Sequence, residues 1–384
     1  MDRVYLDHHA ASQVDPRVRA ALAELDAAGA HWANPSSVHN EGQRSRRALE
    51  RAREQIAAAI GAAPADVVLT GGGTEACNLA VLGSLPDGLR GQGGARAHVV
   101  TTAVEHPAVA EPVDELERAG RIVVTRLPVP EGAPPDAATL AAALTPETRL
   151  CAVQWVNHET GTIFPIAEYA AVCRAAQVPL FVDAIQGFGK LPLALETLGA
   201  DLVALAAHKI GGVAGAGALW VRRSLALQPL LLGGSQERGR RAGTPDVRAQ
   251  LGFGLACGLL DERLAAQPRI AGLRDRLETQ LVAHGARRNG PEGARVATAS
   301  NLWFPGRRSD ALVAALDVEG VAVSAGAACS SGKSEPSPVL LAMHPSEPAR
   351  AGASIRFSFG PEVSDIQSEN ALNACLRVVS RPAA

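Results

Sequence analysis

Lysine is rare in this chain, and one of its few lysines is well placed for covalent chemistry. The 384 residues include 37 basic side chains, of which three are lysines: Lys190, Lys209 and Lys333. A lysine amine can lose its proton and form a Schiff base, whereas an arginine guanidinium effectively cannot. Lys209 follows an apolar run and His208, and glycines come soon after it. We therefore predict that Lys209 is the Schiff-base lysine; a surface lysine is the alternative.

A glycine-rich turn before an expected helix is a candidate phosphate site. The residues GGGTEACN (71–78) follow an apolar run, and Thr74 is expected to begin a helix. The free N–H groups of a helix N-terminus bind phosphate, and Gly73 lets the backbone approach a ligand closely. Taken alone, the pattern fits a plain turn capped by Thr74 somewhat better.

A histidine and an aspartate follow two other apolar runs. His106, in VEHPAV (104–109), could stack on a flat cofactor or transfer protons. Asp183 ends PLFVD (179–183), where a buried carboxylate needs a partner such as a protonated pyridine nitrogen. Helix capping explains either residue alone. In chain order, however, a phosphate cup, a stacking histidine, an aspartate and a Schiff-base lysine together predict the cofactor pyridoxal 5'-phosphate (PLP).

One cysteine has a different setting from the rest. Cys329 lies in SAGAACSSGKSEPS (324–337), a loop of small residues from which a thiolate could enter a crevice and attack. An incidental exposed thiol is the alternative. The other cysteines lie in apolar or helical contexts without a CxxC pair, and we predict that they are reduced packing residues. They are Cys77, Cys151, Cys173, Cys257 and Cys375.

The segments that must position these residues alternate between strand and helix. Apolar runs predict seven strands at 67–70, 98–102, 121–127, 150–156, 179–184, 202–207 and 218–221. Helices are expected at 43–60, 74–85, 107–119, 136–144 and 166–176. This alternation predicts an α/β fold with a mostly parallel sheet between helices. Such sheets bind ligands at the carboxyl ends of their strands, where the candidate residues lie.

The C-terminal part predicts a second, smaller unit. A helical pattern covers 245–285 with a break near Pro268. Strands are then expected at 300–304, 321–324 and 354–359, and helices at 309–318 and 364–378. We predict a large domain at 13–255 and a small α+β domain formed by 1–12 and 256–384, which carries a mobile cysteine loop at about 324–337.

The composition argues against nucleic-acid-binding and membrane proteins. Hydrophobic residues make up 47% of the chain, enough for a sizeable core, and the net charge is −2. Nucleic-acid binders show a basic footprint and stacking aromatics, whereas aromatics are 3% here. The N-terminus does not resemble a signal peptide, and no apolar run approaches the roughly 18 residues of a membrane span. We predict a cytoplasmic protein that binds neither nucleic acid nor membranes.

Longer motifs resemble one enzyme family almost end to end. They include VYLDHHAAS (4–12), ANPSSVHNEG (33–42), NHETGTIFPI (157–166), VDAIQGFGK (182–190), AAHKIGG (206–212), GGSQERGRRAGTPDV (233–247) and SIRFSFG (354–360). The chain resembles the cysteine desulfurases of the nitrogenase and iron–sulfur-assembly type, fold-type I PLP enzymes of the class V aminotransferase superfamily. The resemblance implies that L-cysteine becomes L-alanine. Its sulfur would be held as a persulfide on Cys329 and passed to an acceptor protein, such as an iron–sulfur scaffold, or to a small thiol.

The same resemblance implies roles for individual residues. Lys209 would hold PLP, Asp183 would pair with its pyridine nitrogen, and His106 would stack on the ring and assist proton transfer. Arg356 would hold the substrate carboxylate, a bidentate contact for which arginine is well shaped, and Cys329 would accept the sulfur. The remaining contacts to cofactor and substrate would come from Asn34, Gly73, Thr74, His158, Gln186, His208 and Thr244. The role of Thr244, at the phosphate of a neighbouring subunit, implies a homodimer.

The chain departs from the family at a few positions. His158 stands where the family usually has Asn beside the phenolic oxygen of PLP, and Ala206 stands where it usually has Ser. Losing one phosphate hydrogen bond at Ala206 would cost roughly 1 kcal/mol. His8 and His9 also differ, and Val213-Ala214 replaces a usual Pro-basic pair. The alternatives are a selenocysteine lyase, a cysteine lyase, an aminotransferase or a non-catalytic desulfurase-like subunit.

Overall fold

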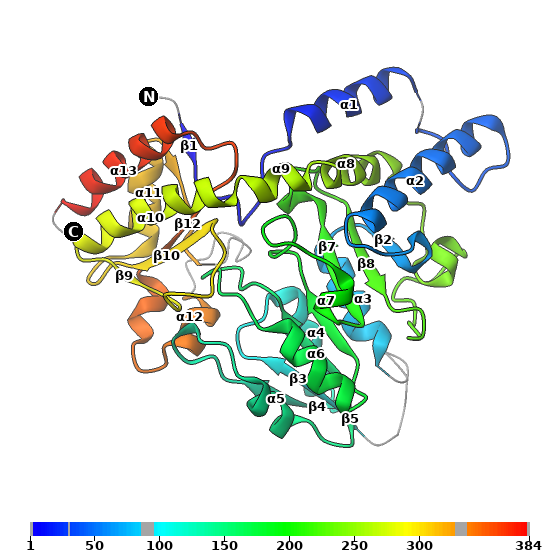
Figure 1. The fold of residues 1–384 in the computed structure, drawn as a ribbon, viewed down its shortest axis with the longest axis horizontal. Coiled ribbons are helices and arrows are strands. Elements are labelled where there is room, and N and C mark those ends of the chain that lie inside the picture. The colour runs from blue at the N-terminus through cyan, green and yellow to red at the C-terminus, as the bar shows by residue number, and fades with distance from the viewer. Residues whose placement is uncertain (1–2, 30, 86–95, 327–335, 382–384) are drawn as a thin grey trace.

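The structure is a computed structural model that describes residues 3–29, 31–85, 96–326 and 336–381 (Figure 1). Its centre is a seven-stranded sheet in the order β2-β8-β7-β6-β5-β3-β4. Strand β8 runs antiparallel to its two neighbours, and the other adjacent pairs are parallel. The strands are β2 (Val67–Thr70), β3 (Ala97–Thr102), β4 (Ile122–Leu127), β5 (Thr148–Gln154), β6 (Leu180–Asp183), β7 (Leu202–Ala206) and β8 (Gly217–Val221). The predicted fold class and all seven predicted strands are confirmed.

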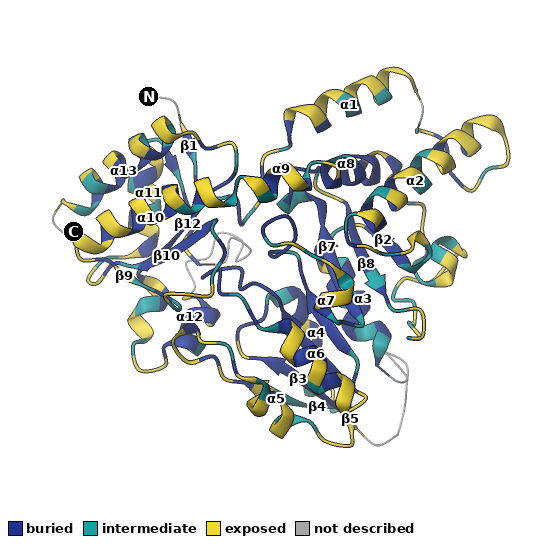
Figure 2. Cartoon of the chain, viewed as in Figure 1, coloured by how far each residue is buried: buried dark blue, intermediate teal, exposed yellow. Residues whose placement is uncertain are grey.

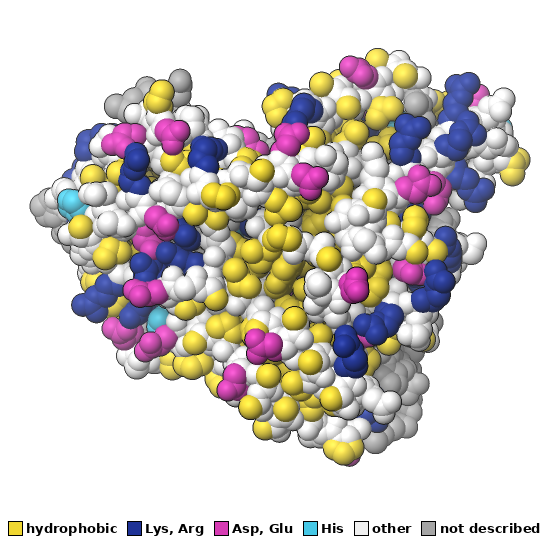
Figure 3. All heavy atoms as spheres, in the orientation of Figure 1, with side chains coloured by type: hydrophobic (Ala, Val, Ile, Leu, Met, Phe, Trp, Pro, Cys, Tyr) yellow, Lys and Arg dark blue, Asp and Glu magenta, His cyan; other side chains and the backbone are white. Residues whose placement is uncertain are grey.

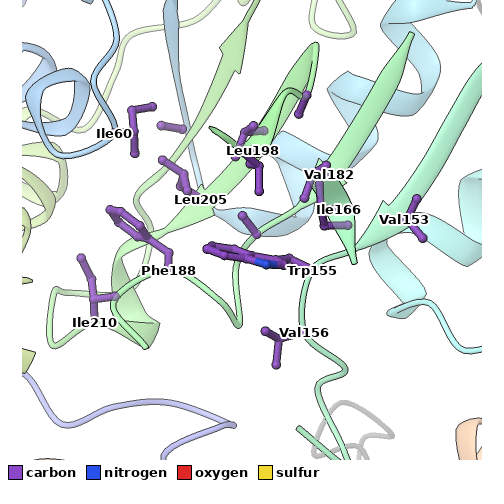
Figure 4. Close-up of a cluster of buried hydrophobic side chains, with 14 of the residues drawn as sticks. Ile60, Val153, Trp155, Val156, Ile166, Val182, Phe188, Leu198, Leu205 and Ile210 are labelled. Carbon is purple, nitrogen blue, oxygen red and sulfur yellow. The ribbon is translucent and has the colours of Figure 1, made fainter. Parts of the chain in front are cut away.

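The central strands are buried on both faces, as their continuous apolar sequences predict (Figure 2). Along β5, Cys151 and Val153 join one hydrophobic cluster, while Leu150 and Ala152 join the cluster on the opposite face. This alternation is the two-residue period of a strand. Figure 4 shows part of the first cluster, in which Trp155 and other side chains fill the space beside the sheet.

Helices cover both faces of the sheet. Helices α3 (Gly73–Ser84) and α4 (Pro107–Arg118) pack on one face, and α2 (Asn40–Ala58), α6 (Ile166–Ala175) and α8 (Val247–Cys257) contribute to the other cluster. The structure adds α1 (Pro16–Ala27) and α7 (Leu195–Leu198), which were not predicted, and confirms α5 (Ala137–Ala143).

The helical region predicted at 245–285 is three helices: α8, α9 (Leu260–Ala265) and α10 (Gln267–Ala283). Pro268 lies in the first turn of α10, where a missing N–H costs no helical hydrogen bond. The predicted break near this proline is therefore confirmed, and a second break separates α8 from α9.

The two ends of the chain share a second hydrophobic cluster. It includes Val4 and Leu6 from the N-terminus and many residues between Ile270 and Val378. Strand β1 (Val4–Tyr5) pairs with β11 (Val321–Ala322), and β12 (Ser354–Ser358), β10 (Ala299–Trp303) and β9 (Arg287–Arg288) form a three-stranded antiparallel sheet. Helices α11 (Ser309–Val318) and α13 (Asp365–Val379) complete this part, while α12 (Pro338–Met343) packs on the larger cluster. The predicted domain boundaries stay a prediction.

One face of the molecule carries a group of basic side chains. Figure 3 shows them gathered over α2, whose Arg44, Arg47 and Arg51 are exposed.

The five cysteines within the described residues are buried and unpaired, which confirms their packing role. Cys329 and Lys333 lie outside the described residues. Within the described ranges, no helix is long and apolar enough to cross a membrane.

Candidate active site

A cavity of about 360 Å³ opens where the carboxyl ends of β5, β6 and β7 meet the N-terminal segment. Its volume lies in the range typical of cofactor pockets. The residues predicted from the sequence that line it are Gly73, Thr74, His106, His158, Asp183, Gln186, His208, Lys209 and Arg356. The strand-end rule accounts for five of the six chain segments around this space, whereas Arg356 comes from within β12 (Ser354–Ser358) of the three-stranded sheet.

Lys209 ends the short 3-10 turn that follows β7. Its Nζ donates to the backbone carbonyls of His9 and Ala10, the second at 2.8 Å. Ser12 clamps the same turn, because its N–H donates to the carbonyl of His208 and its Oγ to that of Lys209. The amine is thus held at the cavity wall by carbonyls of the N-terminal segment.

Asp183 ends β6 and is 6% exposed. Its carboxylate accepts from the N–H of Ile185 at 3.0 Å, yet burial raises its pKa to about 6. The nearby Glu105, which accepts from Thr102 Oγ1, has its pKa raised to about 8 by burial. A cationic partner in the cavity would favour the ionised form of Asp183, as a protonated pyridine nitrogen does.

His106 caps α4 through its ring. Nδ1 accepts from the N–H of Ala108 at 3.0 Å, so the ring proton of neutral His106 is on Nε2. Burial lowers the His106 pKa to about 4, which favours this neutral form. The ring of His158 meets it edge to face, with centroids 5.0 Å apart.

His158 is buried, and neither of its ring nitrogens has a hydrogen-bond partner within the described structure. An unpaired buried polar atom costs roughly 1–3 kcal/mol, so these nitrogens suit a polar ligand in the cavity. The pKa of His158 lies well below its ordinary value because of burial, with His106, Arg356 and Lys209 adding to the effect. Its backbone carbonyl is occupied, since it accepts from Arg356 and His9.

Arg356 lies on β12 and is 2% exposed. One terminal nitrogen donates to Asp7 Oδ1 at 2.8 Å and the other to the carbonyl of His158 at 3.0 Å, while Nε has no partner among the described residues. Asp7 thus neutralises and orients the guanidinium from behind. A substrate carboxylate suits the remaining hydrogen-bonding capacity of Arg356.

Gln186 is oriented by a buried lysine. Lys190 is 8% exposed and donates to the backbone carbonyl and Oε1 of Gln186, both at 2.9 Å. The amide nitrogen of Gln186 then donates to the carbonyl of His9 at 2.8 Å. Burial holds the pKa of Lys190 well below its ordinary value, which favours a neutral amine.

The opposite end of the cavity suits a phosphate. Helix α3 begins at Gly73 with no side chain capping its first N–H groups, and Gly72 precedes it with a φ of 149°. A Cβ at Gly73 would lie 2.5 Å from Ile185 and 3.2 Å from Ala206, so close approach of the backbone requires glycine here. The N-terminus of α3 suits the phosphate of PLP, and Asp183, Lys209 and the unpaired ring nitrogens of His158 suit the rest of the cofactor.

Two predicted residues do not reach the cavity in a single chain. Thr244 and Asn34 are exposed and are absent from its lining. Asn34 instead accepts from the N–H of Ser36 at 2.9 Å. Conversely, the sequence predicted no role for Asp7, because its partner Arg356 is 349 residues away. It also predicted none for Lys190, because its burial does not show in the spacing to its partner Gln186. His9 also lines the cavity, but in the sequence it stood out only as part of the motif VYLDHHAAS (4–12).

The chain was compared with known proteins. The family model described as "Aminotransferase class-V" matches residues 4–367. A cysteine desulfurase from Gluconacetobacter diazotrophicus is 38% identical over 385 residues, covering 99% of this chain and 94% of that protein.

Solved structures agree with this match. A NifS-like protein superposes with a TM-score of 0.90 at 28% identity, covering 98% of this chain and 99% of the other. A structure described as SspA in complex with cysteine gives a TM-score of 0.80 at 30% identity over 93% of this chain and 99% of that chain.

Proposed function

The chain belongs to the aminotransferase class-V family, and on that premise we propose that it is a PLP-dependent cysteine desulfurase. It converts L-cysteine to L-alanine and passes the sulfur to an acceptor. The observation that carries this proposal is the convergence of Lys209, Asp183 and Arg356 on one cavity. These groups are the amine, the acid and the carboxylate-binding cation that the chemistry needs.

The described residues divide the work of holding PLP. Lys209 would supply the amine, Asp183 would pair with the ring nitrogen, and His106 would stack on the ring. Gln186, His158, Gly73, Thr74 and His208 would contact the phenolic oxygen and the phosphate. When bound, PLP supplies an electron sink for the bonds that break at Cα and Cβ of the substrate.

The chain's own groups position the substrate and move protons. Arg356, fixed from behind by Asp7, binds the carboxylate of L-cysteine. The Lys209 amine, held by carbonyls of the N-terminal segment, is the base available for the Cα proton. The buried walls of the cavity exclude water, which strengthens each of these charged contacts.

Cys329 is proposed as the sulfur acceptor. Its thiolate attacks the sulfur of the substrate, so that an S–S bond forms while the Cβ–S bond breaks. The electron pair of the broken bond stays with the carbon skeleton, which takes up a proton and leaves as alanine. The persulfide then gives its outer sulfur to an acceptor protein, such as an iron–sulfur scaffold, or to a small thiol.

A homodimer is proposed as the working unit. Trp32, Val38 and Leu232 are 73%, 89% and 62% exposed, which is unusual for large apolar side chains. Trp32 and Val38 lie within four residues of Asn34, and Leu232 lies twelve residues before Thr244; Asn34 and Thr244 are the two predicted site residues that do not line the cavity of their own chain. A second copy would cover this surface and bring Thr244 to the phosphate of its neighbour. We also propose a cytoplasmic location.

Product analysis tests the function. PLP-loaded protein is mixed with L-cysteine and a reductant, and equal amounts of alanine and sulfide over many turnovers are expected. Pyruvate and ammonia would indicate a lyase instead, and a preference for selenocysteine would indicate a selenocysteine lyase. Cys329→Ala should keep PLP and lose the persulfide, whereas Lys209→Ala should lose the visible absorption band of the lysine-bound cofactor.

A further inference from the structure

The first turn of α3 carries a carboxylate beside the proposed phosphate end of the cavity. Glu75 directly follows Gly73 and Thr74, which line that end. Its Oε2 accepts from the N–H of Gly71 at 2.8 Å, so the side chain reaches back over the turn before the helix. This contact stabilises the start of the helix, but it also places a negative charge where the helix N-terminus would otherwise attract a phosphate.

Arg241 pairs with this carboxylate from a distant part of the chain. Its Nε donates to Oε1 of Glu75 at 2.7 Å, and its Nη2 donates to Oε2 at 3.2 Å. Its Nη1 donates to the carbonyl of Gly243 at 3.3 Å, so the guanidinium is held on two sides. The side chains of Arg241 and Glu75 are 15% and 22% exposed, so their charges attract each other more strongly than those of a fully exposed pair.

The turn that precedes α3 also has contacts that do not involve this ion pair. Thr70 Oγ1 donates to the carbonyl of Gly72 at 3.0 Å, and the carbonyl of Thr70 accepts from Nε2 of Gln250 at 2.8 Å. Gly72 also packs closely on β8, because a Cβ at Gly217 would lie 2.5 Å from its backbone. Removal of the Arg241 guanidinium should therefore change the charge beside the helix N-terminus more than it changes the shape of the turn.

We propose that Arg241 is a positioning residue that maintains phosphate affinity at this end of the cavity by neutralising Glu75. This inference rests on the proposed function, because the phosphate is that of PLP. The described lining of the cavity includes neither Arg241 nor Glu75, so both act through the first turn of α3 rather than by touching the ligand. While the pair is intact its net charge is zero, and the helix N-terminus keeps its attraction for an anion.

A comparison of PLP with pyridoxal tests the effect on the phosphate alone. Both compounds can form a Schiff base with Lys209, but only PLP carries a phosphate, and both affinities can be measured by absorbance titration of PLP-free protein. Arg241→Met should weaken PLP binding about tenfold and change pyridoxal binding less than about twofold, because it leaves Glu75 unpaired beside the anion. An equal loss for both compounds would mean that the variant distorts the cavity, and the proposal would be overturned.

Substitution of the carboxylate separates neutralisation from general support by an ion pair. In Glu75→Gln the amide oxygen can still accept from Gly71 and the negative charge is gone, so PLP should bind at least as tightly as it binds to wild-type protein. The double variant Glu75→Gln/Arg241→Met again has no net charge at the pair and should bind PLP within about twofold of wild type. The proposal is wrong if Glu75→Gln weakens PLP binding as much as Arg241→Met does, or if the double variant binds as weakly as Arg241→Met.

Arg377→Met is the matched control. Arg377, on α13, donates to Oε2 of Glu319 through Nε at 3.1 Å and Nη2 at 2.8 Å, and the described lining of the cavity includes neither residue. This variant loses a similar ion pair and should leave the affinities for PLP and pyridoxal unchanged. If wild-type protein does not bind PLP at Lys209, the proposed function fails. If wild-type protein binds PLP but the variants do not follow the stated order, this inference alone fails.

Discussion

The pairing of Asp7 with Arg356 predicts a large and specific loss of stability when the carboxylate is removed. The guanidinium is 2% exposed and its Nε already lacks a partner within the described residues, so Asp7→Ala leaves a buried charge held by one carbonyl. Breaking a buried pair in this way costs about 3–5 kcal/mol. Because the Asp7 side chain keeps 16% exposure, we expect the lower end of that range.

The assay is urea unfolding of the PLP-loaded protein, with Asp7→Asn and Arg356→Met as companions. Asparagine keeps an acceptor oxygen and should recover about half of the loss. In the Arg356→Met background the buried charge is gone, so Asp7→Ala should cost less than about 1 kcal/mol. An equal cost of Asp7→Ala in both backgrounds would refute the reasoning, because the loss would then not arise from the pair.

Three further predictions follow from single contacts. Burial depresses the pKa of Lys190, so the unfolded chain binds more protons than the folded chain between that pKa and 10.5. The free energy of unfolding in urea should therefore rise from about pH 7 to about pH 9.5, and it should rise less in Lys190→Met. An equal rise in both proteins would contradict the depressed pKa of Lys190. Ser337→Ala removes the cap of Leu340 and the donor to buried Glu159, and should cost about 1–3 kcal/mol of unfolding free energy; a loss near zero would argue against this anchor. Ala206→Ser, beside the Gly73 cradle, should tighten PLP binding about fivefold in equilibrium dialysis if the added hydroxyl reaches the phosphate, and unchanged affinity would show that it does not.

The sheet could be predicted because its strands are short, apolar and buried on both faces. Strand β7, for example, has five buried residues in a row, and no competing helical period is present. Helix α1 escaped prediction because it buries little more than Val18 and Leu22 against the rest of the protein. Helix α12 has six residues, too few to show a period, and is defined by its Ser337 cap and by packing on the larger cluster.

The residues of the candidate site also differ in how far the sequence predicts them. His106, Asp183 and Lys209 were predictable because topology brings the carboxyl ends of parallel strands to one edge of a sheet. The burial of Lys190 and the tautomer of His106 depend on contacts that no spacing rule encodes. Whether Thr244 and Asn34 belong to the site depends on a second chain and stays a prediction.

The N-terminal segment connects the two ends of the proposed active site. Asp7 holds Arg356, and two residues later the carbonyl of His9 receives both Lys209 and Gln186. The segment is itself fixed at both sides, since the N–H of His9 donates to Ser358 Oγ and the N–H of Ser12 to the carbonyl of His208. Asp7 and His9 thus bring Arg356, Lys209 and Gln186 to one short stretch of backbone that lies far from all three residues in sequence.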